Sequence, residues 1–358
     1  MLVPKRVLVL RLDRLGDVVL TLPLLQVLRE HFPHAYIAAL VQPACADVVR
    51  GHPAVNEVLL YDKTGKHRSI NANRRFARRL RKMEFDTAIA AYPSMRSHVL
   101  PWLAGIPVRI GWDWKGWKQS WPLTHRLPHR KQQGTRTESD YTLELLQPFG
   151  ITVEGVRPMM PVQAEAAEQV ERRLREAGWT LPQPLIAVHP SASCISKRWM
   201  PERFAAVADR LAADGFRICL VAGADDLGPV RAVQQAMQRP AIDFAGQLRV
   251  AELAALLARC RLLISNDSGP VHVAAAVGTP TVDIFGRNES GLSPRRWGPV
   301  GRHVILQKDV GCIVCLAHNC DIEFRCLTTL QAEEVYQAAT GLMAQVPSTQ
   351  IDTPKGLC

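Results

Sequence analysis

The chain has 358 residues, 47% of them hydrophobic and 22% charged. This composition is ordinary for a soluble globular protein, and no apolar run approaches the roughly 20 residues of a membrane-spanning helix. The length suits two domains, and the net charge of +11 favours an anionic partner, such as nucleic acid, a membrane surface or a phosphorylated glycolipid.

The first half of the chain alternates strand-like and helix-like segments. Residues 5–11 form a Leu- and Val-rich run typical of a buried strand, and helical spacing follows at 17–31. Further strands are predicted at 36–41 and 87–91, with helices around 46–49 and 74–82. This alternation indicates a doubly wound α/β domain. The N-terminal segment reads as a first strand without a cleavable leader, so we expect a cytoplasmic protein.

Two segments of the first half are unusually basic. Residues 63–82 hold nine Lys or Arg residues and no Asp or Glu. Such a run is either a solvated helix face or an electropositive surface that binds an acceptor, and the sequence leaves both open. Residues 109–136 carry four Trp residues among basic ones, so we expect an irregular surface loop there.

The second half repeats the alternation after a Pro-rich stretch. Residues 149–190 are the predicted linker and contain one helix, at 164–177. Strands are predicted at 185–189, 217–222, 262–265 and 280–285, and helices at 202–213, 230–238, 250–260 and 271–277. We therefore predict a second doubly wound sheet. The expected boundaries are 1–160 and 161–346 for the domains and 347–358 for a loose tail.

The run SNDSGPVH at 265–272 has the features of an anion site, because it joins a predicted strand to a predicted helix. The free N–H groups and the positive dipole end of a helix attract phosphate, and Gly269 lets a ligand approach the backbone. Ser268 and His272 add side-chain donors. The simpler alternative is an ordinary capped helix after a buried strand.

Ligands of open α/β sheets bind beyond the carboxyl ends of the strands. Three candidate segments follow strands in this way: Asp17, residues 193–197 and residues 267–272. Their common position favours a functional reading over three unrelated surface turns.

Four motifs together resemble one known family. They are RLDRLGDVVLTLP at 11–23, GIPVRIG at 105–111, KRW at 197–199 and the segment 246–286, which ends in GTPTVDIFG. The chain resembles the heptosyltransferases of lipopolysaccharide core assembly, glycosyltransferase family nine. The resemblance implies a GT-B architecture, in which two Rossmann-like domains have the active site in the cleft between them.

The resemblance also implies a reaction. The enzyme would transfer heptose from ADP-L-glycero-D-manno-heptose to the inner core of lipopolysaccharide, inverting the anomeric centre, with no metal and no cofactor. The acceptor would be a phosphorylated, Kdo–lipid A-type glycolipid, held by the N-terminal domain, while the C-terminal domain binds ADP-heptose. The protein would then contact the inner face of the inner membrane.

Individual residues take their expected roles from the resemblance and from charge. Asp17 matches the catalytic base, whereas Asp13 is expected only as a turn residue, and Lys197 would stabilise the leaving ADP. The expected donor-binding residues are Gly16, Ser191, Ser193, Lys197, Asp226, Asp267, Ser268, Gly269 and His272. The expected acceptor-binding residues are Arg14, Arg74, Arg75 and Arg78.

The cysteines raise a competing interpretation. Four of the nine, Cys312, Cys315, Cys320 and Cys326, lie within fifteen residues. The first pair forms a CxxC, but the second pair lacks the tight spacing of most zinc sites, and the role of the four is left open. With the basic balance and the Trp residues, the alternative class is a zinc-containing nucleic-acid-binding protein. A family-nine transferase using another nucleotide sugar is the nearer alternative.

Overall fold

The computed structural model describes residues 2–114, 116–312, 315 and 319–345. The predicted tail at 347–358 lies outside these residues. The chain divides into two compact units, Met1–Pro161 and Val162–Cys358. No helix in the described ranges is long and apolar enough to cross a membrane.

The N-terminal unit is built on a six-stranded parallel sheet with the order β3-β2-β1-β4-β5-β6. Its strands are β1 (Arg6–Arg11), β2 (Tyr36–Val41), β3 (Glu57–Leu60), β4 (Thr87–Ala90), β5 (Val108–Asp113) and β6 (His125–Pro128). Its helices are α1 (Leu15–Val19), α2 (Leu22–His31), α3 (Ala46–Val49), α4 (Ile70–Arg81), α5 (Met95–Leu103), α6 (Trp117–Ser120) and α7 (Glu138–Leu143). Short 3₁₀ turns cover Pro43–Cys45, Lys131–Gln133 and Glu144–Phe149.

The C-terminal unit has a second parallel sheet, ordered β12-β11-β10-β7-β8-β9. Its strands are β7 (Leu185–His189), β8 (Arg217–Leu220), β9 (Ile242–Asp243), β10 (Cys260–Asn266), β11 (Thr281–Ile284) and β12 (His303–Leu306). Its helices are α8 (Ala164–Glu176), α9 (Pro201–Ala213), α10 (Gly228–Ala236), α11 (Val250–Arg259), α12 (Gly269–Ala276), α13 (Pro294–Trp297), α14 (Arg325–Thr328) and α15 (Ala332–Ala344). The 3₁₀ turns η4 (Ile195–Lys197) and η5 (Ser290–Leu292) lie in its loops.

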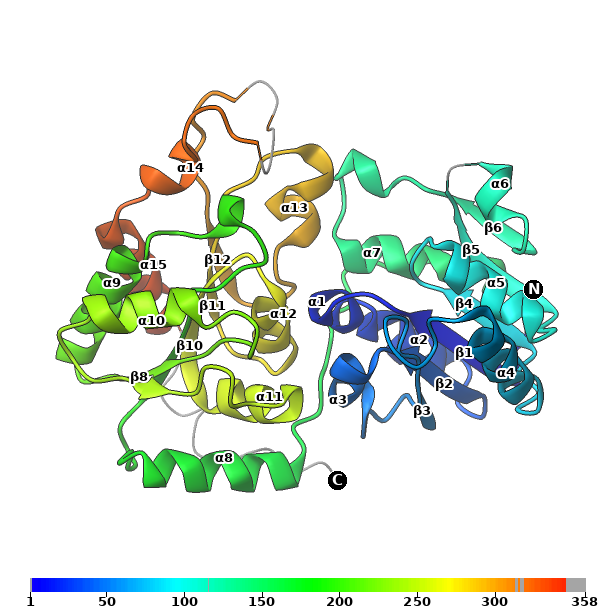
Figure 1. Ribbon diagram of the computed structural model, residues 1–358, viewed down its shortest axis with the longest axis horizontal. Coiled ribbons are helices and arrows are strands. Elements are labelled where there is room, and N and C mark those ends of the chain that lie inside the picture. The colour runs from blue at the N-terminus through cyan, green and yellow to red at the C-terminus, as the bar shows by residue number, and fades with distance from the viewer. Residues whose placement is uncertain (1, 115, 313–314, 316–318, 346–358) are drawn as a thin grey trace. The chain divides into compact units, whose positions relative to one another are not determined.

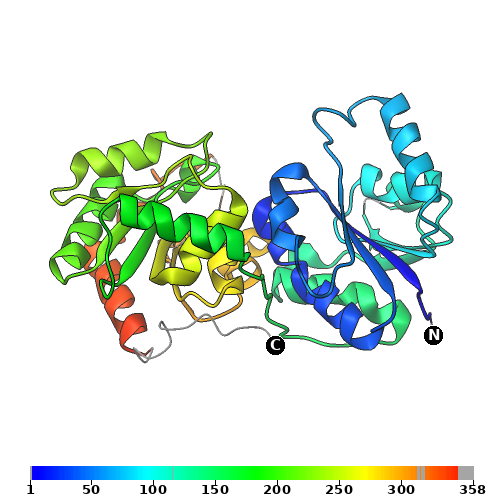
Figure 2. The same cartoon turned by 90° about the horizontal axis from the view of Figure 1, so that it is seen from below.

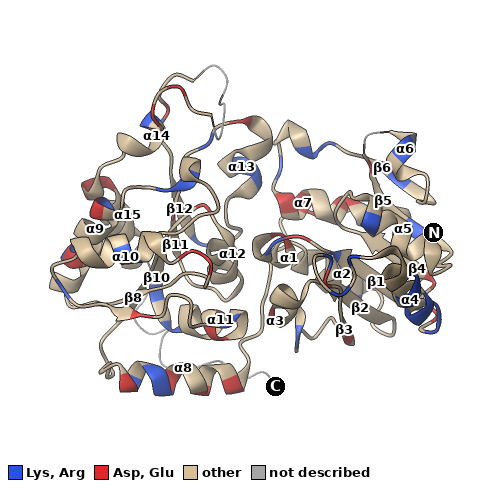
Figure 3. Ribbon diagram, viewed as in Figure 1, with Lys and Arg blue, Asp and Glu red and all other residues tan. Residues whose placement is uncertain are grey.

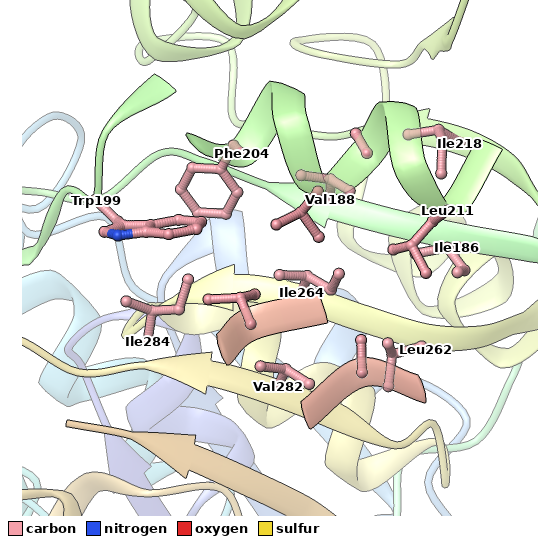
Figure 4. Close-up of a cluster of buried hydrophobic side chains, with 14 of the residues drawn as sticks. Ile186, Val188, Trp199, Phe204, Leu211, Ile218, Leu262, Ile264, Val282 and Ile284 are labelled. Atoms are coloured by element: carbon pink, nitrogen blue, oxygen red, sulfur yellow. The ribbon is translucent and has the colours of Figure 1, made fainter. Parts of the chain in front are cut away.

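Helices cover both faces of each sheet, so both units are doubly wound, as predicted (Figure 1; Figure 2 gives the view from below). In the C-terminal unit, α9 packs against α10 and α15, while α11 packs against α8 and α12. Strand side chains alternate between the two layers. One face carries Ile186, Val188, Ile264 and Val282 into a core with Phe204 and Trp199 (Figure 4).

Helix α4 shows why the basic segment folds. The side chain of Ser69 caps the helix by accepting a hydrogen bond from the Ala72 N–H at 3.2 Å. Phe76 and Leu80 are buried against the sheet, and the arginines occupy the opposite, exposed face. The apolar stripe at helical spacing docks the segment, while the charges stay in water.

Two expectations about local structure are wrong. The predicted helix at 17–31 is two helices, because Pro23 lies in the first turn of α2, where its ring disfavours continuing α1. The predicted surface loop at 109–136 contains β5, α6 and β6, and Trp112 is fully buried. Tryptophan residues among basic ones are typical of a surface, but β5 places the Trp112 indole in the core.

The two sheets share one topology. In each, the first strand, β1 or β7, lies between the second strand and the fourth strand of its unit. The strand order therefore reverses beside β1 in one unit and beside β7 in the other. Such a switch point leaves a crevice beyond the carboxyl ends of the two central strands, where ligands of this fold bind.

Candidate active site

The N-terminal switch point holds a buried arginine surrounded by carboxylates. Arg11, the last residue of β1, is 2% exposed. Its guanidinium donates to Asp17 Oδ1 at 2.7 Å, to Glu138 Oε1 at 3.3 Å and to the Ala91 carbonyl after β4 at 2.8 Å. Arg11 thus ties the ends of β1 and β4 together and fixes the Asp17 carboxylate, whose second oxygen accepts from the Arg14 N–H at 3.3 Å.

Asp13 belongs to the same network, which the sequence did not predict. Its Oδ2 lies 3.1 Å from Arg11 Nε. Burial raises the pKa of Asp13 to about 6, against the opposing charge of Arg11 and with the help of the charges on Asp17 and Glu138. Two carboxylates, Asp13 and Asp17, therefore share one guanidinium at the strand end, and both are candidates for proton transfer.

The cluster also contains Glu138 and Lys131, which lie near the C-terminal end of the N-terminal unit. Lys131 Nζ lies 2.6 Å from Glu138 Oε1, and both side chains are almost fully buried. Buried charges need such partners, because an unpaired ion in the interior costs several kcal/mol or more. Sequence reasoning missed the contact of Glu138 with Arg11, since the two residues are 127 positions apart in the chain.

The structure separates the predicted acceptor residues into two groups. Arg14 caps α1 beside Asp17, at the carboxyl edge of the sheet. Helix α4 starts after β3 and runs back toward the start of β4, and Arg81 near its end donates to the Leu103 carbonyl ahead of β5. Arg74, Arg75 and Arg78 are exposed on this helix and are not brought together with Asp17. Figure 3 shows the basic residues along α4.

At the C-terminal switch point, hydrogen bonds of polar side chains join the loops after β7 and β10. Asn266 donates to the Pro190 carbonyl at 2.7 Å and accepts from the Trp199 N–H at 3.1 Å. Ser191 is buried and donates to the Asp226 carbonyl at 2.8 Å. These contacts hold the loop that carries Lys197, and donor binding by Ser191 stays a prediction.

The structure brings together Lys197 and Asp267, two of the expected donor-binding residues. Lys197 Nζ lies 2.5 Å from Asp267 Oδ2 and donates to the Asp267 carbonyl at 3.3 Å. Helix α12 begins two residues later at Gly269, so the lysine lies close to a helix N-terminus. A cation beside unsatisfied N–H groups is an arrangement that binds phosphate.

The remaining predicted donor residues are placed as follows. Ser268 is the N-cap of α12, and its Oγ lies 3.1 Å from His189 Nδ1. His272 is buried in the first turn of α12, and Ser193 is exposed in the loop after β7. Asp226 pairs with Arg198 at 3.0 Å. Gly16 lies in α1 of the N-terminal unit.

Two charged residues near Lys197 escaped sequence reasoning. Asp283 on β11 is fully buried, and neither of its carboxyl oxygens has a hydrogen-bond partner within the described ranges. Burial and then the charge on Asp267 raise the pKa of Asp283 well above its ordinary range. Arg287 follows β11, with its NH2 group 3.6 Å from Asp267 Oδ2. The sequence signal that could have identified Asp283 is an acidic residue inside a strand that is otherwise mostly apolar.

The four clustered cysteines line one cavity of about 270 Å³. Cys326 Sγ donates to the Gly286 carbonyl at 2.7 Å, and burial raises the pKa of its thiol to about 11. Among the residues that the structure describes, no three His, Cys, Asp or Glu side chains are arranged to hold a metal ion.

Two parallel, doubly wound units are the architecture of the GT-B class of nucleotide-sugar-dependent glycosyltransferases, a fold that the chain shares with solved heptosyltransferases. The model of glycosyltransferase family 9 (heptosyltransferase) matches residues 73–325, and the chain belongs to this family. It is therefore a glycosyltransferase.

Individual relatives agree with this placement. The chain is 30% identical to lipopolysaccharide heptosyltransferase 3 of Escherichia coli over 76% of this chain and 81% of the relative. A family 9 glycosyltransferase from Veillonella parvula is similar in structure, with a TM-score of 0.85, 28% identity and coverage of 96% and 98% of the two chains. E. coli ADP-heptose lps heptosyltransferase II has the same fold, with a TM-score of 0.80, 21% identity and coverage of 95% and 99%.

His189 makes the stability of the C-terminal unit depend on pH. Burial lowers the pKa of its imidazole to about 4, so between pH 4 and 6.5 the folded unit binds fewer protons than the unfolded chain. The free energy of unfolding should fall by about 2 kcal/mol from this group as the pH drops from 7.5 to 5. Urea unfolding at both pH values should show a smaller drop for His189→Gln than for wild type.

The exposed His303 provides the control, because His303→Gln should keep the wild-type pH dependence. An unchanged pH dependence in His189→Gln would contradict a neutral buried imidazole.

Proposed function

We propose that this enzyme transfers heptose from ADP-L-glycero-D-manno-heptose to the inner core of lipopolysaccharide, with inversion of the anomeric centre. The name of the E. coli heptosyltransferase II that shares the fold includes ADP-heptose and lps, which supports a donor and an acceptor of these classes. The observation that carries the proposal is the pairing of Lys197 with Asp267 beside the start of α12, which suits a diphosphate leaving group.

In the proposed reaction, Asp17 accepts the proton of the acceptor hydroxyl as that oxygen attacks the anomeric carbon. The bond from this carbon to the β-phosphate oxygen breaks, and ADP leaves from the opposite face. Arg11 supports the step by holding Asp17 Oδ1 at 2.7 Å, so that the carboxylate does not need to reorient during catalysis.

The C-terminal unit stabilises the negative charge that develops on ADP. Lys197 contributes a cation, while Ser268, Gly269 and His272 at the start of α12 contribute donors and close backbone approach. Ser193 extends these contacts to phosphate, and Asp226 takes the ribose hydroxyls. No metal is required in this scheme, because fixed donors and a helix N-terminus neutralise the diphosphate.

The acceptor is proposed to be a phosphorylated Kdo–lipid A-type glycolipid at the inner face of the inner membrane. Arg14 lies beside Asp17 and suits an anionic group of the acceptor near the reacting hydroxyl. The exposed arginines of α4 suit phosphates further away, either on the lipid anchor or on neighbouring lipids.

Substitutions of Asp17 and Lys197 should have different effects on ADP binding and on turnover. Asp17→Asn should keep ADP affinity, measured by calorimetry, but slow transfer by roughly 10²- to 10⁴-fold, because only the base is lost. Lys197→Ala should slow transfer by roughly 10²-fold and also weaken ADP binding.

Asp13→Asn is the matched comparison, since both carboxylates contact Arg11. If Asp13→Asn abolishes transfer while Asp17→Asn turns over normally, the base is Asp13 and the assignment is wrong. Normal ADP affinity in Lys197→Ala would show that this lysine does not bind the ADP of the donor.

The basic face of α4 should govern contact with anionic lipid. Reversing Arg74 and Arg78 to Glu should weaken binding to phosphatidylglycerol vesicles at least about tenfold, because each charge near a surface contributes about 1 kcal/mol. The acceptor KM should rise in parallel.

Reversing Arg172 and Arg175 on α8 provides a matched control, because both are exposed and lie on a helix of the other unit. Equal vesicle binding by wild type and the α4 variant would show that the arginines of α4 form a merely solvated face.

A further inference from the structure

Arg287 is a buried cation whose position the family resemblance does not explain. It is 8% exposed, and its Nε has no hydrogen-bond partner among the residues that the structure describes. Its terminal NH2 faces Asp267 Oδ2 at 3.6 Å, which is too long for a hydrogen bond. A guanidinium presents five donors, and burial without full satisfaction is costly, so this side chain is poised for a further acceptor.

The backbone places Arg287 directly against the loop that carries Lys197. A Cβ atom on Gly286 would come within 2.5 Å of the Ser196 carbonyl oxygen, so the chain after β11 and the turn η4 are in close contact. The Asp267 N–H donates to the Ile284 carbonyl at 3.0 Å, which joins the ends of β10 and β11. Arg287, Lys197 and the start of α12 therefore lie at one edge of one sheet.

Two cations face one carboxylate at this edge. Lys197 Nζ and Arg287 NH2 lie 2.5 and 3.6 Å from Asp267 Oδ2. Burial raises the pKa of Asp283, the buried acid of β11, well above its ordinary range. The two cations lie next to the start of α12, and a helix N-terminus also favours an anion.

We propose that Arg287 is a second phosphate-binding cation of the donor site, acting beside Lys197 on the diphosphate of the ADP-sugar. This inference rests on the proposed function, because it takes the ligand of the C-terminal unit to be a nucleoside diphosphate sugar. The planar guanidinium gives up its long contact with Asp267 and donates charge-assisted hydrogen bonds to phosphate oxygens. Asp267 keeps Lys197 as its partner.

The test compares ADP with adenosine, which lacks the phosphates. Binding to the full-length protein is measured by calorimetry for ADP and by displacement titration for adenosine. Arg287→Ala should weaken ADP binding roughly 10- to 100-fold and leave adenosine binding unchanged, because only charge-assisted contacts to phosphate are lost. Arg287→Lys keeps the charge without the planar guanidinium, so its ADP affinity should lie between those of wild type and Arg287→Ala.

Arg302→Ala is the matched control. This arginine is exposed, and its carbonyl accepts from the N–H of Thr281, the first residue of β11, so it lies at the opposite edge of the same sheet. It should bind ADP as wild type does.

Three results would overturn the inference, and only the third would also contradict the proposed function. Wild-type ADP affinity in Arg287→Ala, together with weakened binding in Lys197→Ala, would exclude Arg287 and keep the proposed function. Equal losses for ADP and adenosine would show that Arg287 only maintains the fold of the loop. Failure of the wild-type protein to bind ADP would remove the proposed donor site itself, and Arg287 with it.

Discussion

Reversal of strand order beside β1 and β7 is the constraint on which the rest of this molecule depends. Parallel strands are buried on both faces, so their side chains are mostly apolar, and Arg11, Lys197 and Asp267 lie at or beyond strand ends. At a switch point the loops after the two central strands diverge, which leaves room for a ligand. Asp17 and Lys197 follow β1 and β7, and Asp267 follows β10, in accordance with this rule.

The two strand ends differ in their charged side chains. At the N-terminal switch point, three carboxylates, Asp13, Asp17 and Glu138, surround the cations Arg11 and Lys131. At the C-terminal one, the two cations Lys197 and Arg287 face the carboxylate of Asp267. A cluster of carboxylates suits removal of a proton, and a pair of cations suits a departing diphosphate. The proposed division of acceptor and donor chemistry between the units follows from this difference.

The sequence predicted what depends on local patterning. Strands β1, β7 and β10 follow from their Leu-, Ile- and Val-rich runs, and the position of Lys197 and Asp267 after strands predicts that both lie at one sheet edge. It did not predict that Trp112 is buried, because hydrophobic residues among basic ones look like a surface. Nor did it find Glu138 or Arg287, whose roles depend on contacts between distant segments that spacing does not encode. The shared topology of the units was also hidden, since different residues satisfy the same alternation.

The proposed transfer can be observed by mass spectrometry of a heptose-deficient core glycolipid that has been incubated with the protein and ADP-heptose. Each acceptor should gain the mass of one heptose, and the acceptor mass should not change when ADP-glucose replaces ADP-heptose. An acceptor that gains mass from ADP-glucose but not from ADP-heptose would contradict the proposed donor. An acceptor left unchanged by both sugars, with a protein that binds ADP, would contradict the proposed acceptor.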